Sequence, residues 1–193
     1  MCRAQRLSVR QSAVVLICLS AVGCGVGRDR AIAIQNDHVR LAVGINGRWQ
    51  HFVDRATGID YCPQDPAPVV GRVRIGAREH DAVSATAAGD GIRLGFADTE
   101  VQATLKIIRH PRYFVVEVVS VEGTGAEVFT FLDLPLTLKG SPGEPFAACA
   151  LALNLKTNIA EIPRPVGRLV AMCHRRFGFE GAQAAIVACP PDK

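Results

Sequence analysis

From residue 31 onward, apolar and polar residues alternate in short segments, and this period of two predicts β-strands with one buried face. Between residues 38 and 45 every second side chain is aliphatic, namely Val39, Leu41, Val43 and Ile45. The pair Asn46-Gly47 follows and predicts a type I′ hairpin turn, in which both central residues take positive φ. In the next segment, strict alternation puts Trp49 on the same face as His51 and Val53, opposite Gln50, Phe52 and Asp54.

Strand-like segments recur along the rest of the chain at a spacing of roughly 8–12 residues. The predicted strands are Ala31–Gln35, His38–Ile45, Trp49–Asp54, Ile59–Cys62, Val69–Ile75, Asp81–Ala87, Ile92–Ala97, Val101–Arg109, Tyr113–Val121, Glu127–Leu138, Leu151–Leu155, Arg168–Cys173 and Ala184–Cys189. Pro135 marks its segment as an edge strand or a bulged one. Only Glu180–Val187 suggests a helical period, and it is short.

This pattern predicts an all-β fold, an antiparallel β-sandwich formed by one domain over residues 31–193. No internal repeat and no second domain is visible in the sequence. The last strand runs directly into Pro190-Pro191 and the chain stops at Lys193. That ending is compatible with a truncated sandwich or with a fragment of a longer protein.

Residues 1–23 are typical of a signal peptide. Arg3, Arg6 and Arg10 form a basic region, and the apolar stretch 12–22 is too short to remain as a membrane span. Ala21-Val22-Gly23 then precedes Cys24 and resembles a bacterial lipobox, which implies lipidation of Cys24 and a short tether over 24–30. Ordinary secretion with cleavage near Gly23 remains the alternative. Either outcome predicts export to the periplasm, outer membrane or cell surface, and a lipid on Cys24 would be the only membrane anchor.

The charge of the chain changes once this leader is removed. The full sequence carries a net charge of +4, but without the leader 19 basic and 18 acidic residues remain, a net charge of +1. Nucleic-acid binding therefore loses its electrostatic basis. The densest basic cluster left is His174-Arg175-Arg176, which could meet an anionic polysaccharide or a lipid headgroup, or could form a solvated hairpin loop.

Four cysteines remain after the leader and Cys24: Cys62, Cys149, Cys173 and Cys189. In an exported chain they allow two disulfides, one, or none, because free buried cysteine also packs as a small hydrophobe. No Cys-x-x-Cys pair exists and the five histidines lack ligand-like spacing, so neither a metal site nor a cofactor is predicted. No serine lies in a Gly-x-Ser-x-Gly elbow.

The segment Ile34–Tyr61 resembles the start of the galactose-mutarotase-like β-sandwich (supersandwich type) that accompanies large bacterial glycoside hydrolases and polysaccharide lyases. The matching residues are Asn36, Val39, Arg40, Leu41, Val43, Gly47, Phe52, Asp54, Thr57, Gly58 and Tyr61. The resemblance implies an accessory module next to a separate catalytic domain. The chain departs from mutarotases proper, which are longer and carry paired histidines and a glutamate base.

The only tryptophan, Trp49, offers the clearest candidate for a sugar site. Its ring could stack on a sugar while Arg48, Gln50 and His51 supply hydrogen bonds; the alternative is a core aromatic of the hairpin. We interpret Asp54 as a turn-capping residue and Glu117 as a paired or edge-facing carboxylate, and we assign no catalytic residue, since no carboxylate pair suited to glycosidases is evident.

The sequence therefore predicts an exported non-catalytic module of a carbohydrate-active protein. It would bind a polysaccharide or oligosaccharide, or support a catalytic domain or partner chain. Two alternatives remain open: a mutarotase-like epimerase or lyase that uses Glu117 or Asp54 with a histidine, and a structural envelope lipoprotein with a protein partner.

Overall fold

The computed structural model describes residues 31–141, 143–159 and 167–190, and within them the chain is all-β. Besides strands it contains one turn of 3-10 helix, η1 (Arg175–Phe177). The strands are β1 (Ala31–Gln35), β2 (Val39–Gly44), β3 (Trp49–Asp54), β4 (Arg72–Ile75), β5 (Arg78–Ala88), β6 (Gly91–Phe96), β7 (Gln102–Arg109), β8 (Tyr113–Glu122), β9 (Ala126–Pro135), β10 (Ala147–Ala152), β11 (Thr157–Ile159), β12 (Arg168–His174) and β13 (Gln183–Cys189). The predicted antiparallel β-sandwich is confirmed.

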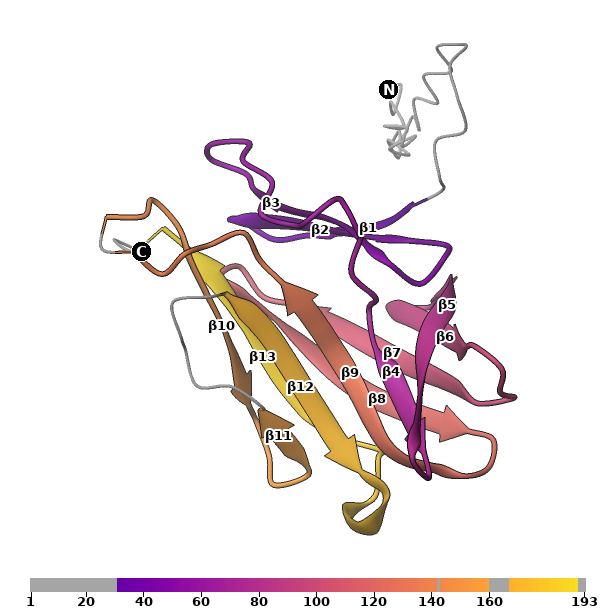
Figure 1. Ribbon diagram of the computed structural model, residues 1–193. Helices are drawn as coiled ribbons and strands as arrows, with labels where there is room; N and C mark the ends of the chain where they lie inside the picture. The colour runs from indigo at the N-terminus through magenta and orange to yellow at the C-terminus, as the bar shows by residue number, and fades with distance from the viewer. Residues whose placement is uncertain (1–30, 142, 160–166, 191–193) are drawn as a thin grey trace, which may run out of the picture.

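The strands form two sheets. β1, β2 and β3 make a small three-stranded sheet, and the other ten strands follow the order β10-β13-β8-β7-β6-β5-β4-β9-β12-β11. Figure 1 shows the large sheet folded into two facing layers, with the three-stranded sheet lying across one end. β10 also lies beside β11 and β12, so the large sheet nearly closes on itself.

β5 forms the corner between the two layers. Its first residues, 78–81, pair with β4, and residues 82–88 pair with β6. The register shifts between Ala82 and Ser84, which leaves Val83 as an extra, half-exposed residue. Such a bulge bends a strand and increases its twist, which lets one strand serve both layers.

Large apolar side chains fill the space between the layers and beneath the small sheet. Phe96 meets Phe129 edge to face, and Phe129 lies beside Phe131. Nearer the small sheet, Tyr61 stacks on Phe146 with ring centroids 5.2 Å apart. These contacts join the three-stranded sheet to the large sheet through one continuous core.

The hairpin between β2 and β3 differs from the predicted type I′ turn. Gly47 has a φ of 71°, but Asp98 is the only non-glycine residue with positive φ in the described chain, so Asn46 does not share that conformation. Ile45, predicted to be buried, is 49 % exposed in the turn. Gly47 is required there because a Cβ would lie 2.9 Å from the backbone of Ala82.

A bulge in β3 also changes which side chains share a face. Ala42 pairs with His51 but Val43 pairs with Trp49, so Gln50 is an extra residue in the ladder. Trp49 therefore joins Phe52 on the buried face, and the predicted pairing of Trp49 with His51 on one face is wrong. The physical reason is that one inserted residue reverses the alternation on one side of it.

The proline-containing strand β9 lies inside the large sheet, between β4 and β12. The edge-strand interpretation is wrong, and the bulge interpretation is confirmed. Glu127 is extra relative to β4, and Phe131 is extra relative to β12. Pro135 is tolerated because it is the last residue of the strand, where the ladder ends.

The remaining differences concern short segments. Residues 59–62 form an isolated bridge at Asp60, rather than a strand. β10 begins at Ala147, before the predicted 151–155, and β11 was not predicted. Residues 183–187 belong to β13, so the weak helical period in 180–187 does not form a helix.

Candidate functional site

The outward face of the three-stranded sheet carries a shallow hollow of about 550 Å³, here called the outer-sheet hollow. Small residues form its floor, because Ala33 pairs with Ala42 and Ala31 pairs with Gly44, while His51 stands beside Ala42 at one side. Side chains of one or no carbon on the floor leave room that longer neighbours enclose. The lining residues are Ala31, Ala33, Arg40, Ala42, Asn46, Arg48, Trp49, Gln50, His51, Gln64 and Ala67.

Hydrogen bonds hold several of the polar walls in place. The Arg48 guanidinium donates to the Ala67 carbonyl at 2.7 Å. The Gln64 amide donates to the carbonyls of Gln50 and Cys62, each at 2.9 Å. The loop 63–68 is thereby tied to β3, and it fixes two planar polar groups at the edge of the hollow.

His51 is oriented by Asp60. The His51 Nδ1 atom lies 2.6 Å from one carboxylate oxygen of Asp60, and the other oxygen accepts the N–H groups of Phe52 and Cys62. His51 keeps 43 % of its side chain exposed. The imidazole is therefore positioned toward solvent by a carboxylate that is itself held by the backbone.

Arg40 is the least constrained cation of the hollow. It is exposed on β2, and within the described residues no hydrogen bond or ion pair holds its guanidinium. Together with Arg48, it gives the hollow two permanent positive charges against the single carboxylate of Asp60. A guanidinium matches carboxylate and sulfate groups with two parallel hydrogen bonds, so this surface suits an anionic ligand.

Trp49 does not present its ring to this hollow. Its side chain is only 3 % exposed, and its indole N–H donates to the Asp133 carbonyl at 3.1 Å. The ring is a core group, which agrees with the packing interpretation and removes the predicted stacking platform. Arg48 and His51 do reach the hollow, and their contact with a glycan stays a prediction.

The structure adds Arg40, Gln64 and Asp60 to the residues proposed from the sequence. Arg40 occupies a polar position in an alternating strand, so the pattern could have indicated that it faces outward. Gln64 lies in a proline-rich loop, and no sequence signal connects it to β3. Its placement depends on the tertiary fold.

The two carboxylates considered for catalysis lie elsewhere. Asp54 is 1 % exposed and caps its turn, accepting from Ala56 N at 2.9 Å and from the Thr57 hydroxyl at 2.6 Å. The turn-capping interpretation is thus confirmed. Glu117 lies on the outer face of the large sheet, between Lys106 and Gln183 in register. The structure brings neither of them to the outer-sheet hollow.

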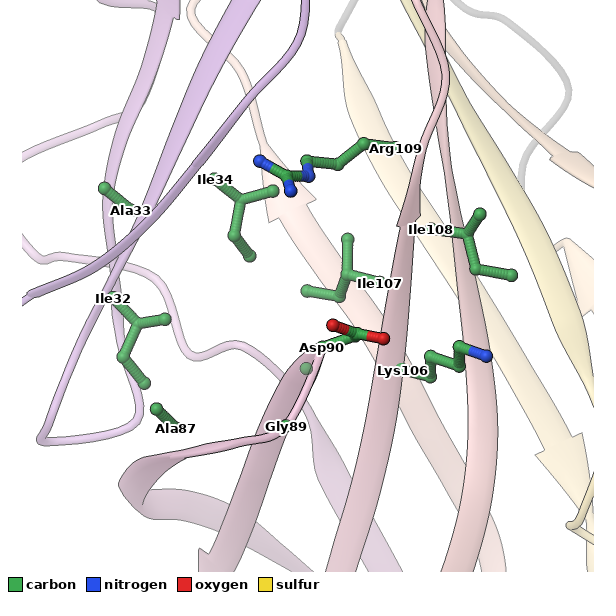
Figure 2. A pocket seen from close by; sticks show the side chains of 11 residues that line it. Ile32, Ala33, Ile34, Ala87, Gly89, Asp90, Lys106, Ile107, Ile108 and Arg109 are labelled. Atoms are coloured by element: carbon green, nitrogen blue, oxygen red, sulfur yellow. The ribbon is translucent and has the colours of Figure 1, made fainter. Parts of the chain in front are cut away.

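A second hollow of about 570 Å³ lies on the other side of β1, between the small sheet and strands β6 and β7. Figure 2 shows Ile32, Ile34 and Ile107 pointing into it, while Lys106 and Ile108 point away. Arg109 extends toward Ile34 at one side. Its walls combine aliphatic side chains with the charged groups of Asp90 and Arg109, which carry opposite charges.

A third hollow, of about 680 Å³, surrounds the basic cluster predicted at 174–176. Arg74 and Glu127 complete it, and their side chains approach to 3.9 Å. Arg176 lies over the ring of Phe177, 4.6 Å from its centroid. This cluster lies at the opposite end of the large sheet from the small sheet, as the position of η1 in Figure 1 shows.

The four cysteines of the described chain are free thiols. Burial raises the pKa of Cys62 to about 12, with a smaller contribution from the charge of Asp60. Burial also raises the pKa of Cys173 to about 12, although Lys156 acts in the opposite direction. Both thiols are therefore protonated near neutral pH and behave as small apolar groups.

Some sequence predictions fall outside the described residues. The signal peptide, Cys24 and the tether 24–30 all precede Ala31. In the part of the chain that is described, no helix is long and apolar enough to span a membrane. Nor do three or more His, Cys, Asp or Glu side chains of those residues gather where they could hold a metal ion.

Comparison with known proteins supplies no relative. No protein-family model, no curated protein and no solved structure matches this chain.

Proposed function

We propose that this chain is an exported, non-catalytic β-sandwich module that binds an acidic polysaccharide at the outer-sheet hollow. The observation that carries the proposal is that two arginines line the hollow above a floor of small residues. Arg48 is held by the Ala67 carbonyl, whereas the guanidinium of Arg40 has no partner among the described residues. Acidic sugars carry carboxylate or sulfate groups, which such guanidinium groups bind through charge-assisted hydrogen bonds.

The absence of an exposed aromatic ring in this hollow narrows the ligand class. Neutral glycans depend on apolar contact with aromatic faces, and Trp49 is buried here. A uronic acid or sulfated sugar can instead be held by Arg40 and Arg48, with amide groups of Gln50 and Gln64 receiving its hydroxyls. Binding of this kind is weak per sugar unit and weakens as salt is added.

Two features of the sequence support the wider role. The pattern of residues 1–23 supports export, and the resemblance of Ile34–Tyr61 to glycoside hydrolase and lyase modules supports a place in a carbohydrate-active protein. The catalytic domain or partner chain that the module would support is part of the same proposal. Membrane attachment would depend on the lipid at Cys24.

Calorimetric titration of the purified protein with a hexamer of galacturonic acid and with a neutral glucose hexamer tests the ligand class. We expect the acidic hexamer alone to bind, with affinity falling as salt rises. Arg40→Gln should weaken binding about tenfold, the loss of roughly one charge-assisted hydrogen bond. The matched control is Arg93→Gln, which removes an exposed arginine of β6 that forms an ion pair with Glu122 of β8.

The outcome distinguishes this proposal from its alternatives. Equal affinity of wild type and Arg40→Gln would exclude the outer-sheet hollow as the site. If neither hexamer binds, the structural envelope lipoprotein becomes the better hypothesis. Faster interconversion of galactose anomers, followed by proton-exchange NMR, would instead favour the mutarotase-like enzyme. Palmitate labelling in a bacterial host, lost in Cys24→Ala, tests the anchor.

A further inference from the structure

Two of the four cysteines lie together on the outer face of the large sheet. In the ladder between β10 and β13, Cys149 pairs with Val187 and Ala147 pairs with Cys189. Ala148 and Ala150 pack against the core, so the alternate residue Cys149 points the other way. By the same alternation Ala188 faces the core and Cys189 faces outward. Cys149 and Cys189 are therefore diagonal neighbours on one face of adjacent strands.

The other two cysteines are not placed to form a disulfide. Cys62 and Cys173 are 3 % and 0 % exposed and belong to the core. Cys173 pairs with Phe129 on β9, whereas the residue before Cys62 accepts a hydrogen bond from Thr137 N. The stretch from 129 to 137 spans roughly 26 Å at the rise of an extended chain. Bridging them would require the core to come apart.

Diagonal neighbours in an antiparallel pair lie roughly 7–8 Å apart between Cα atoms, with their Cβ atoms somewhat closer. A disulfide usually spans a Cα separation of about 4.4–6.8 Å, so closing this pair requires a backbone shift of roughly 1 Å. β10 can supply it, because it is hydrogen-bonded in the ladder to β13 alone. The pKa of the Cys149 thiol is raised mainly by burial and further by the nearby Cys189 sulfur, which is a second sign that the two sulfurs are close.

We propose that Cys149 and Cys189 form a disulfide when the chain reaches an oxidising compartment, while Cys62 and Cys173 remain thiols. The inference goes beyond the proposed glycan binding and rests only on the exported location that accompanies it. Both partners are partly exposed, so an oxidant can reach them.

The reaction is a thiol–disulfide exchange with a small or protein-borne disulfide as oxidant. The thiolate of one cysteine attacks the oxidant and forms a mixed disulfide, and one oxidant thiolate leaves. The second cysteine loses its proton and attacks the mixed disulfide, which releases the second oxidant thiolate. The protein loses two protons and two electrons, and the oxidant disulfide is reduced to two thiols.

The cross-link would tie an edge strand to the last strand of the sandwich. β10 has one ladder partner, and Leu151 within it and Leu153 and Leu155 just after it are exposed. An edge of this kind can pair with another chain. A bond from Cys149 to Cys189 would oppose detachment of β10 and would also reduce the entropy of the unfolded chain.

Tryptic mapping after equilibration of the folded protein with oxidised and reduced glutathione tests the pairing. Cys149 lies in the tryptic peptide 140–156 and Cys189 lies in 177–193, and each peptide contains a single cysteine. We expect a mass loss of about 2 Da and a covalent pair of these two peptides. Cys62 and Cys173 should be alkylated only after unfolding. The melting temperature should rise by roughly 5 °C on oxidation, and neither Cys149→Ala nor Cys189→Ala should show this rise.

Several results would overturn the inference. Alkylation of both Cys149 and Cys189 after oxidation, or a cross-link that contains Cys62 or Cys173, would exclude this pairing. The thiol assay uses no glycan, so the disulfide can be confirmed even if the calorimetric titration shows no glycan binding. Equally, glycan binding can be confirmed even if no disulfide forms. Counting free thiols in the protein recovered from the periplasm and from the cytoplasm of a bacterial host then tests whether the disulfide depends on export. The inference requires the bridge in the periplasmic protein and free thiols in the cytoplasmic one.

Discussion

The indole nitrogen of Trp49 donates a hydrogen bond to the main-chain carbonyl of Asp133, 3.1 Å away. Trp49 belongs to the three-stranded sheet and Asp133 to β9 of the large sheet, so this bond joins the two sheets. The backbone of Asp133 is also held by the segment before β4, because its N–H donates to the Val70 carbonyl. The only tryptophan of the chain is thus a structural link rather than a surface platform.

Replacing this tryptophan tests the link. Trp49→Phe keeps an aromatic ring in the core but removes the N–H donor and some buried area, so the free energy of unfolding should fall by about 2 kcal/mol. Urea unfolding followed by circular dichroism measures it. Tyr113→Phe, at a half-exposed position on β8, is the control and should change stability by less than about 0.5 kcal/mol. Equal effects in both variants would contradict the role of Trp49.

The side chain of Asp133 forms a buried ionic centre. Arg168 donates to its two oxygens at 2.8 and 3.0 Å, and Arg72 lies 3.0 Å from one of them, although Asp133 is only 2 % exposed. Asp133→Asn should lower the free energy of unfolding by about 3 kcal/mol, because two guanidinium groups lose their shared partner. Glu127→Gln, which breaks the exposed 3.9 Å contact with Arg74, should cost under about 1 kcal/mol. Equal losses of unfolding free energy in Asp133→Asn and Glu127→Gln would show that burial does not strengthen the ion pairs of Asp133.

The buried thiols predict that stability falls at alkaline pH. The pKa of Cys62 and of Cys173 is raised to about 12 in the folded protein, above the value of about 8.5 expected when unfolded. Stability from this source is therefore complete below pH 8 and is lost as pH rises toward 12, because only the unfolded thiols ionise in between. The loss is on the order of 1 kcal/mol per pH unit for each thiol.

Urea midpoints at pH 8, 9 and 10, measured with a reducing agent present, test this dependence. In Cys173→Ala the decline between pH 9 and 10 should be about half that of the wild type, since one of two strongly shifted thiols is gone. The slope, unlike the absolute stability, is insensitive to the cavity that the substitution leaves. A slope equal to that of the wild type would contradict the assignment to Cys173.

The turn after β3 isolates the effect of backbone conformation. Gly58 has a φ of 77°, and a Cβ placed there would meet nothing within 4 Å. Gly58→Ala should therefore cost about 1 kcal/mol through strain alone. At Gly91, in contrast, a Cβ would lie 1.8 Å from the Leu105 carbonyl oxygen, so Gly91→Ala should prevent stable folding. Thermal unfolding distinguishes them, and equal melting temperatures would refute both accounts.

Parts of the fold follow from local pattern with little error. β1 and β3 have the predicted bounds, because a period of two and clear turn residues define them. The turn at Asp54 also follows locally, since the aspartate, Thr57 and Gly58 hold it within five residues. β10 begins earlier than predicted because residues 147–150, three alanines and Cys149, show no alternation of apolar and polar side chains, and the strand there is selected by pairing with β13.

The candidate site could be predicted only in part. Arg48 and His51 were found because they flank a lone tryptophan. The bulge at Gln50 was invisible in the pattern, and it is what turns Trp49 inward and leaves His51 at the surface. Gln64 and Asp60 reach the site through contacts between a loop and a strand, which no local spacing encodes.

By itself the sequence determined the all-β class, most strands and the turn chemistry, because alternation and turn residues act over a few neighbouring positions. The tertiary structure decided which residues meet. It placed the ring of Trp49 against Asp133, gathered Arg40 and Arg48 over small residues, and set Cys149 beside Cys189. These relationships depend on bulges and on the register between distant strands, where a shift of one residue exchanges the two faces of a sheet.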